Sequence, residues 1–194
     1  MAIPKLLAFS GSLRRQSFNT MLVKVAAAGA TQVGAEVTVI HLKDYPMPLY
    51  DQDWADQHGL PDSVLQLKAL AKAHHGYLIA SPEYNGSLTG ALKNTIDWLS
   101  RPEPDEAPLG LTCFRDKTAA IMATSPGGLG GLRGLSHLRT ILSGVGVLVL
   151  PDQKAVPGAT QVFDATGNLS DTAQRDSIYA LGAKLAQVTG RLLD

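Results

Sequence analysis

The sequence has very little cysteine and no excess of charge of either sign. Its 194 residues include one cysteine, Cys113, which excludes an internal disulfide and favours a reducing compartment. The 17 basic and 17 acidic side chains cancel formally, so nothing in the charge suggests nucleic acid or an anionic membrane as a partner. These absences leave a cytoplasmic globular protein as the expectation.

Long apolar runs are also missing. No stretch approaches the roughly 20 residues that a membrane-spanning helix needs. The chain turns polar at Ser10, which is too early for a signal peptide. A chain of this length is most simply one domain, residues 1–194, with a full hydrophobic core. No repeat or low-complexity tract interrupts it.

Short apolar runs alternate with helical patterns along the chain. The apolar runs have strand length and are continuous, as expected for strands covered on both faces; they span residues 5–9, 37–42, 76–80, 118–123 and 146–150. Helical patterns fall between and after them, at residues 19–30, 62–73, 90–100, 134–144 and 172–193. The alternation predicts an α/β fold with a five-stranded parallel sheet.

Two irregular segments stand out from this alternation. Residues 101–110 combine three prolines with four charged side chains, which predicts a solvated loop. Residues 43–59 form a longer loop, and a loop of this length is either functional or a plain surface excursion.

The loop after the first apolar run predicts a phosphate site. It runs from Ser10 to Asn19, straight into the first helical pattern. Backbone N–H groups at a helix start attract anions, and hydroxyl donors add to that attraction. Helix capping is an alternative reading for Ser17 alone. Capping does not account for the other polar side chains of the loop, which are Ser10, Ser12, Arg14, Arg15 and Asn19.

Two familiar nucleotide-binding loops are absent at this position. The loop has no Gly-Lys-Ser/Thr of the Walker A type, and only Gly11 is available of the three glycines in a dinucleotide fingerprint. A hydroxyl-rich loop suits a terminal phosphomonoester better than a pyrophosphate.

The glycine-rich loop at residues 124–134 has three readings. Gly128, Gly130 and Gly134 nearly form a dinucleotide fingerprint, and Asp152 follows 18 residues after the last of them, at the end of the next predicted strand. Against this reading, the third glycine is one position late, and the loop follows the fourth strand, not the first. The glycines could instead let the backbone lie close to a flat ligand, or serve only as turn residues.

A polar loop with one aromatic follows the third buried run, at the start of the segment SPEYNGSLTGALKNTIDWLSR. In the strand order 2-1-3-4-5 this loop meets the loops after the first and fourth strands at one end of the sheet, where ligands bind. We therefore expect a flat ligand between residues 82–86 and the glycine loop. Tyr84 would pack against it, although anchoring of its own loop is the alternative role.

Three motifs resemble those of the NADPH-dependent FMN reductase family, whose relatives include bacterial quinone, chromate and azo-dye reductases. They are GSLRxxSFN, PEYNxSxxGxLKNxIDWLSR and GGxxGxxxxxHLRxIL, and together they run in order from Leu7 to about Pro151. The middle motif is the specific one. The resemblance implies a flavodoxin-like three-layer sandwich, FMN bound without a covalent link, and assembly as a homodimer or homotetramer.

The resemblance also implies the site residues. The FMN phosphate would meet Ser10, Ser12, Arg14, Arg15, Ser17 and Asn19. The isoalloxazine ring and the ribityl chain would meet Pro82, Glu83, Tyr84, Asn85 and Gly86, and the third loop would close the pocket with Ser125 and Gly127. Gly86 stands where chromate-reductase relatives carry a second aromatic, which predicts a more open pocket mouth.

The function implied by the resemblance is that of an FMN-dependent oxidoreductase with NADPH or NADH as reductant. Such an enzyme would pass electrons by a ping-pong mechanism to quinones, free flavin, azo compounds or metal oxyanions such as chromate. We expect no catalytic side chain and no metal site, because in flavin chemistry the protein supplies position and electrostatics.

Two other classes of function stay open from the residues alone. One is a flavodoxin-type electron carrier without NAD(P)H oxidase activity, which the balanced charge does not favour. The other is a nucleotide-binding regulatory domain built on Gly128, Gly130 and Asp152.

The helical pattern at residues 90–100 suggests a contact between copies of the chain. Leu92, Ile96 and Leu99 share one stripe that can face the sheet, and Trp98 lies off it. Trp98 is then either packed under a neighbouring loop or placed at a subunit contact, where Trp and Arg are enriched. With the oligomeric habit of the family, we expect Trp98, Arg101 and the loop 101–110 at or beside an interface.

Overall fold

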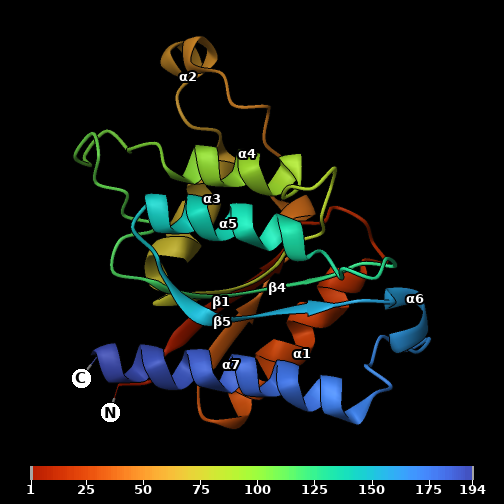
Figure 1. Ribbon diagram of the computed structural model, residues 1–194. Helices are drawn as coiled ribbons and strands as arrows, with labels where there is room; N and C mark the ends of the chain where they lie inside the picture. Colours follow the sequence, from red (N-terminus) through yellow and green to blue (C-terminus); the bar gives the residue numbers. More distant parts are fainter. Residues whose placement is uncertain (1, 194) are drawn as a thin grey trace.

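Five parallel strands form one sheet in the order β2-β1-β3-β4-β5 (Figure 1). The structure, a computed structural model, describes residues 2–193. The strands are β1 (Lys5–Ser10), β2 (Glu36–Val39), β3 (Gly76–Ala80), β4 (Thr118–Thr124) and β5 (Leu148–Val156). Both the α/β class and the strand order predicted from the sequence are confirmed.

Helices cover the sheet on both faces and complete the three layers (Figure 1). One face carries α1 (Phe18–Gln32) and α7 (Thr172–Leu193), and the other carries α3 (Asp62–Ala73), α4 (Gly90–Leu99) and α5 (Leu132–Gly144). Successive strand residues point to opposite faces, so Leu6 packs under the first pair of helices and Leu7 under the other three. Within residues 2–193, none of the helices has the length and apolar character to cross a membrane.

The fifth strand corrects the sequence analysis. The apolar run at 146–150 was expected to be the whole strand, but β5 begins at Leu148 and continues through Pro151 to Val156. Its pairing with β4 jumps from Ala119–Val149 to Ile121–Gln153, which is a β-bulge. A proline is tolerated at a bulge on an edge strand because it interrupts no ladder that the sheet needs.

The second strand is shorter than predicted, and three short helices were not predicted at all. β2 ends at Val39 instead of residue 42, because a 3-10 turn, η1 (Leu42–Asp44), follows it. The ring Nδ1 of His41 caps this turn by accepting the Lys43 N–H at 3.1 Å. The other two unpredicted elements are α2 (Gln52–His58) and α6 (Ala159–Val162).

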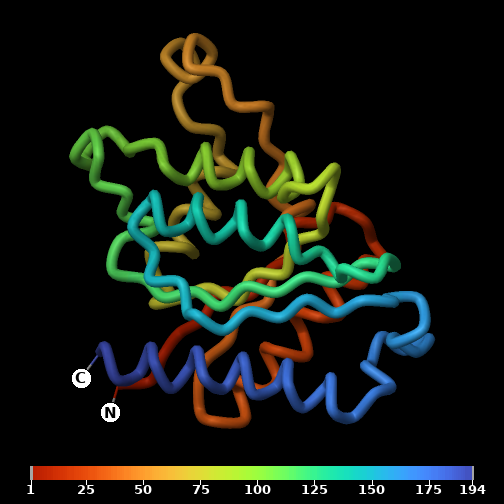
Figure 2. Tube along the Cα trace, in the orientation of Figure 1, coloured from red at the N-terminus to blue at the C-terminus, as the bar shows by residue number. Residues whose placement is uncertain are grey.

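Residues 45–60, which we call the arm, stand away from the rest of the trace with α2 at the tip (Figure 2). The base of the arm is fastened to α4. The Pro48 carbonyl accepts hydrogen bonds from Asn94 Nδ2 at 2.9 Å and from Trp98 Nε1 at 2.8 Å. Asn94 Oδ1 in turn accepts the Tyr50 N–H at 2.8 Å. The long loop of the sequence analysis is therefore an ordered excursion that α4 holds in place.

The arm also corrects the expectation for Trp98. This side chain is 0% exposed, and Tyr50 and Trp54 meet it edge to face, with ring centroids 5.0 Å and 5.9 Å away. A residue that its own chain covers completely is not available to a second copy. Of the two readings offered by the sequence, packing under a neighbouring loop is the one that holds.

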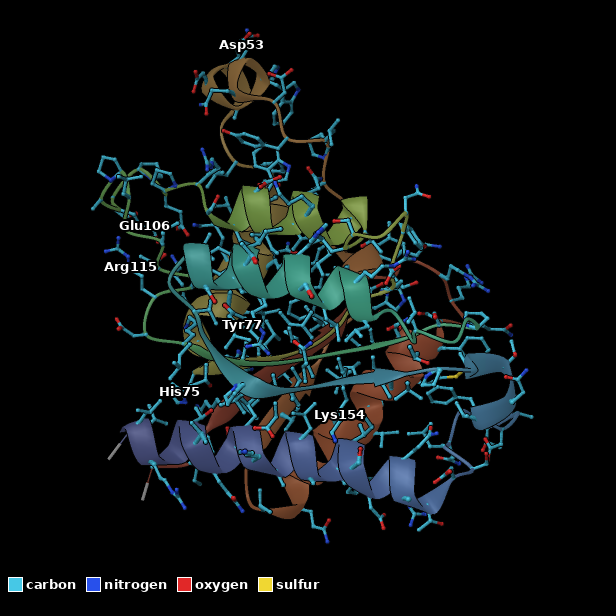
Figure 3. All side chains as sticks on the ribbon, in the orientation of Figure 1. Asp53, His75, Tyr77, Glu106, Arg115 and Lys154 are labelled. Carbon is cyan, nitrogen blue, oxygen red and sulfur yellow. The ribbon has the colours of Figure 1, made fainter. Side chains whose placement is uncertain are left out.

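The proline-rich loop 101–110 is tied to α3 by a buried charge network. Lys68, which is 1% exposed, donates to the Arg101 carbonyl at 2.7 Å and to Glu106 at 3.3 Å. Burial raises the pKa of Glu106, but hydrogen bonds from the Glu103 N–H, Thr112 and Lys72 and the charge of Lys68 outweigh it, so the pKa falls to about 2. Figure 3 labels Glu106 in this loop and Asp53 at the far tip of the arm.

The Glu106 network predicts a pH-dependent stability. A carboxyl whose pKa is depressed on folding contributes fully above its unfolded value, about 4.3, and loses that contribution as the pH falls through the folded value. We expect Glu106→Gln to lower the free energy of unfolding at neutral pH by about 3 kcal/mol. The deficit should shrink to less than half of that at pH 3, in denaturant unfolding curves. Asp105→Asn, at an exposed neighbouring position, is the control and should change little; a Glu106→Gln deficit that does not vary with pH contradicts the assignment.

Candidate functional site

Three loops gather beyond the carboxyl edge of the sheet, on the right in Figure 1. They follow β1 (residues 11–17), β3 (residues 81–89) and β4 (residues 125–131). Parallel strands present their carboxyl ends at one edge, and ligands bind there where the strand order switches, between β1 and β3. The polar loops singled out in the sequence therefore lie at one end of the molecule.

Buried polar contacts fasten these loops to one another. The Thr89 hydroxyl donates to the Gly11 carbonyl at 2.6 Å, which joins the loops after β1 and β3. Asn19 joins the first and third loops, because its Nδ2 donates to the Thr124 carbonyl at 2.9 Å and its Oδ1 accepts the Thr124 N–H at 3.0 Å. Glu83 joins the second and third loops by binding the start of α5. The three loops thus form one assembled rim.

The loop after β1 contains three nearly buried serines. Ser10, Ser12 and Ser17 are 2–4% exposed. Each hydroxyl oxygen accepts one backbone N–H, from Ser12, Arg14 and Thr20 respectively. Within residues 2–193, none of the three hydroxyl groups donates its own hydrogen to an acceptor. A group of buried O–H donors at a helix start is a fitting receptor for a phosphate.

The capping role of Ser17 is observed as well. Ser17 is the N-cap of α1, and its side chain accepts the Thr20 N–H at 3.4 Å. Capping uses the lone pair of the hydroxyl and leaves its proton, so both readings offered by the sequence are compatible. Arg14 and Arg15 are exposed beside it.

The polar loop after β3 ends in a tight hairpin. Tyr84 and Ser87 exchange backbone hydrogen bonds at 2.9 Å and 3.1 Å, and the two residues between them have positive φ, 52° at Asn85 and 81° at Gly86. These angles define a type I′ turn, for which Asn-Gly is the preferred pair. The turn leaves the N–H groups of Asn85 and Gly86 at the tip, outside the hydrogen bonds of the pair, and Tyr84 is 51% exposed.

Glu83 lies in the same loop but points towards α5. The N-cap of α5 is Gly131, which has no side chain to cap the helix. The Glu83 carboxylate accepts the N–H groups of Arg133 at 3.0 Å and Gly134 at 3.3 Å instead, and the Arg133 guanidinium also binds it. Burial raises the pKa of Glu83, but the hydrogen bonds from Arg133 and Gly134 prevail and lower it. Glu83 therefore acts as a helix cap supplied by another loop.

The glycine-rich loop packs closely against the sheet and the hairpin. A Cβ on Gly130 would come within 2.6 Å of the Val156 backbone, and one on Gly131 within 2.7 Å of the Ala123 side chain. Gly134 faces the Ser87 carbonyl in the same way, at 3.1 Å. These glycines serve close packing, whereas Gly128 has open space around it and a Cβ on Gly127 would make only an ordinary contact, at 3.8 Å from the Ser125 hydroxyl oxygen.

The dinucleotide reading of this loop fails on Asp152. That reading needs an acid at the carboxyl end of the following strand. Because β5 continues to Val156, Asp152 lies in the interior of the strand, at the bulge, and it pairs with Lys184 of α7 at 2.5 Å. The Gly128–Gly130–Gly134 pattern is therefore not a dinucleotide fingerprint.

The structure thus brings together all three predicted loops, but it gives several residues different tasks. Asn19 and Glu83 were expected to touch a ligand. In the structure the Asn19 side chain is hydrogen-bonded to the backbone of Thr124, and the Glu83 side chain to the first turn of α5. Sequence reasoning missed Thr89, although a threonine just ahead of Gly90 and a helical pattern is a capping signal. It also missed Thr124, whose backbone N–H and carbonyl bind the Asn19 amide.

The remaining candidates lie outside this rim. Cys113 is fully buried, and burial raises the pKa of its thiol, which disfavours the reactive thiolate. Among residues 2–193 there is no group of three or more His, Cys, Asp or Glu side chains that could hold a metal ion.

The sequence and the structure are similar to known flavoenzymes. A family model described as NADPH-dependent FMN reductase matches residues 4–161. An NAD(P)H-dependent FMN reductase of Pseudomonas aeruginosa is 36% identical over 175 residues, which cover 90% of this chain and 89% of that protein. A quinone reductase of Escherichia coli is 35% identical over 173 residues, covering 87% and 86%.

A solved structure extends the similarity to three dimensions. The flavoenzyme NAD(P)H:acceptor oxidoreductase of Paracoccus denitrificans matches with a TM-score of 0.80 at 28% identity, over 97% of this chain and 98% of that one.

The capping role of Glu83 can be tested by comparing the stability of two variants, one that removes the cap and one that removes only the ion pair. Glu83→Ala removes the acceptor for two N–H groups of α5, so we expect it to lower the free energy of unfolding by about 1–2 kcal/mol. Arg133→Ala removes only an ion pair whose arginine side chain is 65% exposed, and it should cost less than about 1 kcal/mol. Denaturant unfolding of both variants decides, and equal losses would show that the ion pair matters more than the cap.

Proposed function

Because the chain belongs to the NADPH-dependent FMN reductase family, we propose that it binds FMN at the rim of three loops and passes electrons from NAD(P)H to quinones. The observation that carries the proposal is the group of three buried serine hydroxyls whose hydrogens are not donated to any acceptor in residues 2–193. They stand at the start of α1, beside a hairpin whose tip has free amides. The first feature suits a phosphate and the second the polar edge of a flat ring.

The loop after β1 would hold the phosphate in two ways. The hydroxyls of Ser10, Ser12 and Ser17 would donate to its oxygens, and the first N–H groups of α1 would add their partial positive charge. Arg14 and Arg15 would supply full charges from the exposed side. Asn19 would contribute by tying α1 to Thr124, because both polar atoms of its amide are already engaged.

The other two loops would hold the ring and the ribityl chain. Asn85 and Gly86 would donate their amides to the polar edge, while Pro82 and Tyr84 would pack against the ring. Ser125 and Gly127 would close the site from the third loop, where a Cβ on Gly127 would meet only the Ser125 hydroxyl, at 3.8 Å. Glu83 would act by keeping the hairpin against α5.

When bound, FMN supplies the hydride and electron chemistry. The chain then has to bind, orient and shield the cofactor. Exposed apolar side chains of the three loops would shield the ring from water; they are Leu13, Tyr84, Leu129 and Leu132. We propose that no side chain of this chain acts as an indispensable acid or base.

We propose quinones as the main acceptors, with free flavin, azo compounds and chromate as wider possibilities of the same exposed ring. We also propose a homodimer or homotetramer. Since Trp98 is buried within its own chain under the arm, we propose that a contact near α4 would be formed by the arm and the loop 101–110.

The phosphate assignment predicts a difference between FMN and riboflavin. Arg15→Ala and Ser17→Ala should each weaken FMN binding about tenfold or more, because each removes a donor to a charged group. Riboflavin should bind the wild type far more weakly than FMN and should not respond to Arg15→Ala. Fluorescence titration of the apoprotein gives the affinities. Lys24→Ala removes a charge from an exposed position on α1 and is the control; equal affinity for FMN and riboflavin would refute the assignment.

The single rim also predicts ping-pong kinetics. NAD(P)H and the quinone would have to occupy the same place in turn, so double-reciprocal plots at several quinone concentrations should be parallel. Intersecting lines would point to separate sites for the two substrates. If the purified protein binds FMN but does not oxidise NAD(P)H with any quinone, the protein is an electron carrier instead.

A further inference from the structure

An apolar pocket of about 370 Å³ lies between the base of the arm, the loop after β1 and the first turns of α4. Its walls include Leu13, Leu42, Tyr45, Met47, Ala91 and Thr95. The volume is at the small end of the range for ligand sites, roughly 300–1,000 Å³. It suits a substituent of a ligand better than a whole nucleotide.

The pocket adjoins the rim of three loops, because Leu13 of the loop after β1 is one of its lining residues. The Thr89 hydroxyl is bonded to the Gly11 carbonyl at 2.6 Å, and this pair joins the loops after β1 and β3. Two residues beyond each partner, Leu13 and Ala91 form facing walls of the pocket. Leu13 is 47% exposed, so part of its apolar side chain is accessible beside the rim.

Two of the polar side chains in the walls, Asn94 and Thr95, are already engaged. Asn94 gives its amide to Pro48 and Tyr50 of the arm. The Thr95 hydroxyl donates to the Ala91 carbonyl within α4 at 2.8 Å. Lys43 lies at the exposed edge. The rest of the lining is hydrocarbon, the Tyr45 ring with its hydroxyl and the thioether of Met47, a side chain that adapts its shape to varied apolar ligands.

We propose that this pocket receives the apolar side chain of a substituted quinone while the quinone ring lies at the rim. The inference rests on the proposed function, which supplies a ligand with a flat polar head. It adds that the preferred acceptors carry a hydrocarbon substituent. Each methylene group taken from water into the pocket adds to the affinity.

The test compares two benzoquinones with the same ring substituents, one with a decyl chain and one with hydrogen at the last ring carbon. The FMN-loaded protein reduces each with NADPH. We expect Met47→Asp to lower kcat/KM for the decyl quinone about tenfold and to leave the short quinone within about twofold, because a carboxylate in the pocket wall replaces the apolar contact with the chain by a charge that must stay hydrated. Ala91→Leu, which fills the pocket and keeps a good helix former in α4, should act in the same direction.

A binding measurement and a matched variant complete the test. Equilibrium dialysis of the decyl quinone without NADPH should show the same loss of affinity in Met47→Asp, with FMN affinity unchanged. Leu49→Asp makes a comparable change on the arm, at a side chain that is 83% exposed, and should leave both quinones unaffected.

The outcomes separate this inference from the proposed function. If neither quinone is reduced by the wild type, the proposed function fails, and dialysis still reports on the pocket. If both are reduced but Met47→Asp and Ala91→Leu lower both equally, or leave the decyl quinone unchanged in kinetics and dialysis, the side chain lies elsewhere and this inference is wrong.

Discussion

The assembled rim depends first on the pair of hydrogen bonds between the Asn19 amide and the backbone of Thr124. Parallel strands bring their loops to one edge of the sheet but do not join them, because each connection returns along the outside. Asn19 provides the join between two segments that are 105 residues apart. With the side chain 4% exposed, its removal would leave a buried N–H and C=O without partners, which is costly.

Thr89 and Glu83 serve the same purpose by a related route. Every helix begins with N–H groups that have no partner inside the helix. Thr89 accepts the Leu92 N–H of α4 and also donates to Gly11 of another loop. Glu83 reaches from its own loop to the first N–H groups of α5. The contacts that cap the helices are therefore also those that set the loops at fixed positions around a common space.

Helix α4 connects the rim to the arm. Its first turn borders the rim, and its later turns hold Pro48 and Tyr50 through Asn94 and Trp98. A consequence is that the polar atoms of α4 are used for folding on the side where the apolar pocket lies. None of the residues of α2 is buried. The hydrogen bonds that hold the arm in place are therefore mainly those at its base.

The pattern of residues along the chain was enough to predict the fold, which the structure confirms, and to single out three loops that the structure brings to one edge of the sheet. Continuous apolar runs separated by helical patterns predicted the sheet, and Ser17 just ahead of a helical pattern offered the cap, because such signals act over a few residues. The turn at Asn85-Gly86 was not predicted, although this pair is an equally local signal. The edge strand was misjudged, since Pro151 is acceptable only where a bulge and a free edge coincide. Only the tertiary structure decided the partners of Asn19, Glu83 and Trp98. Those partners are 50 to 105 residues away, and no local pattern specifies which of several buried groups a polar side chain will meet.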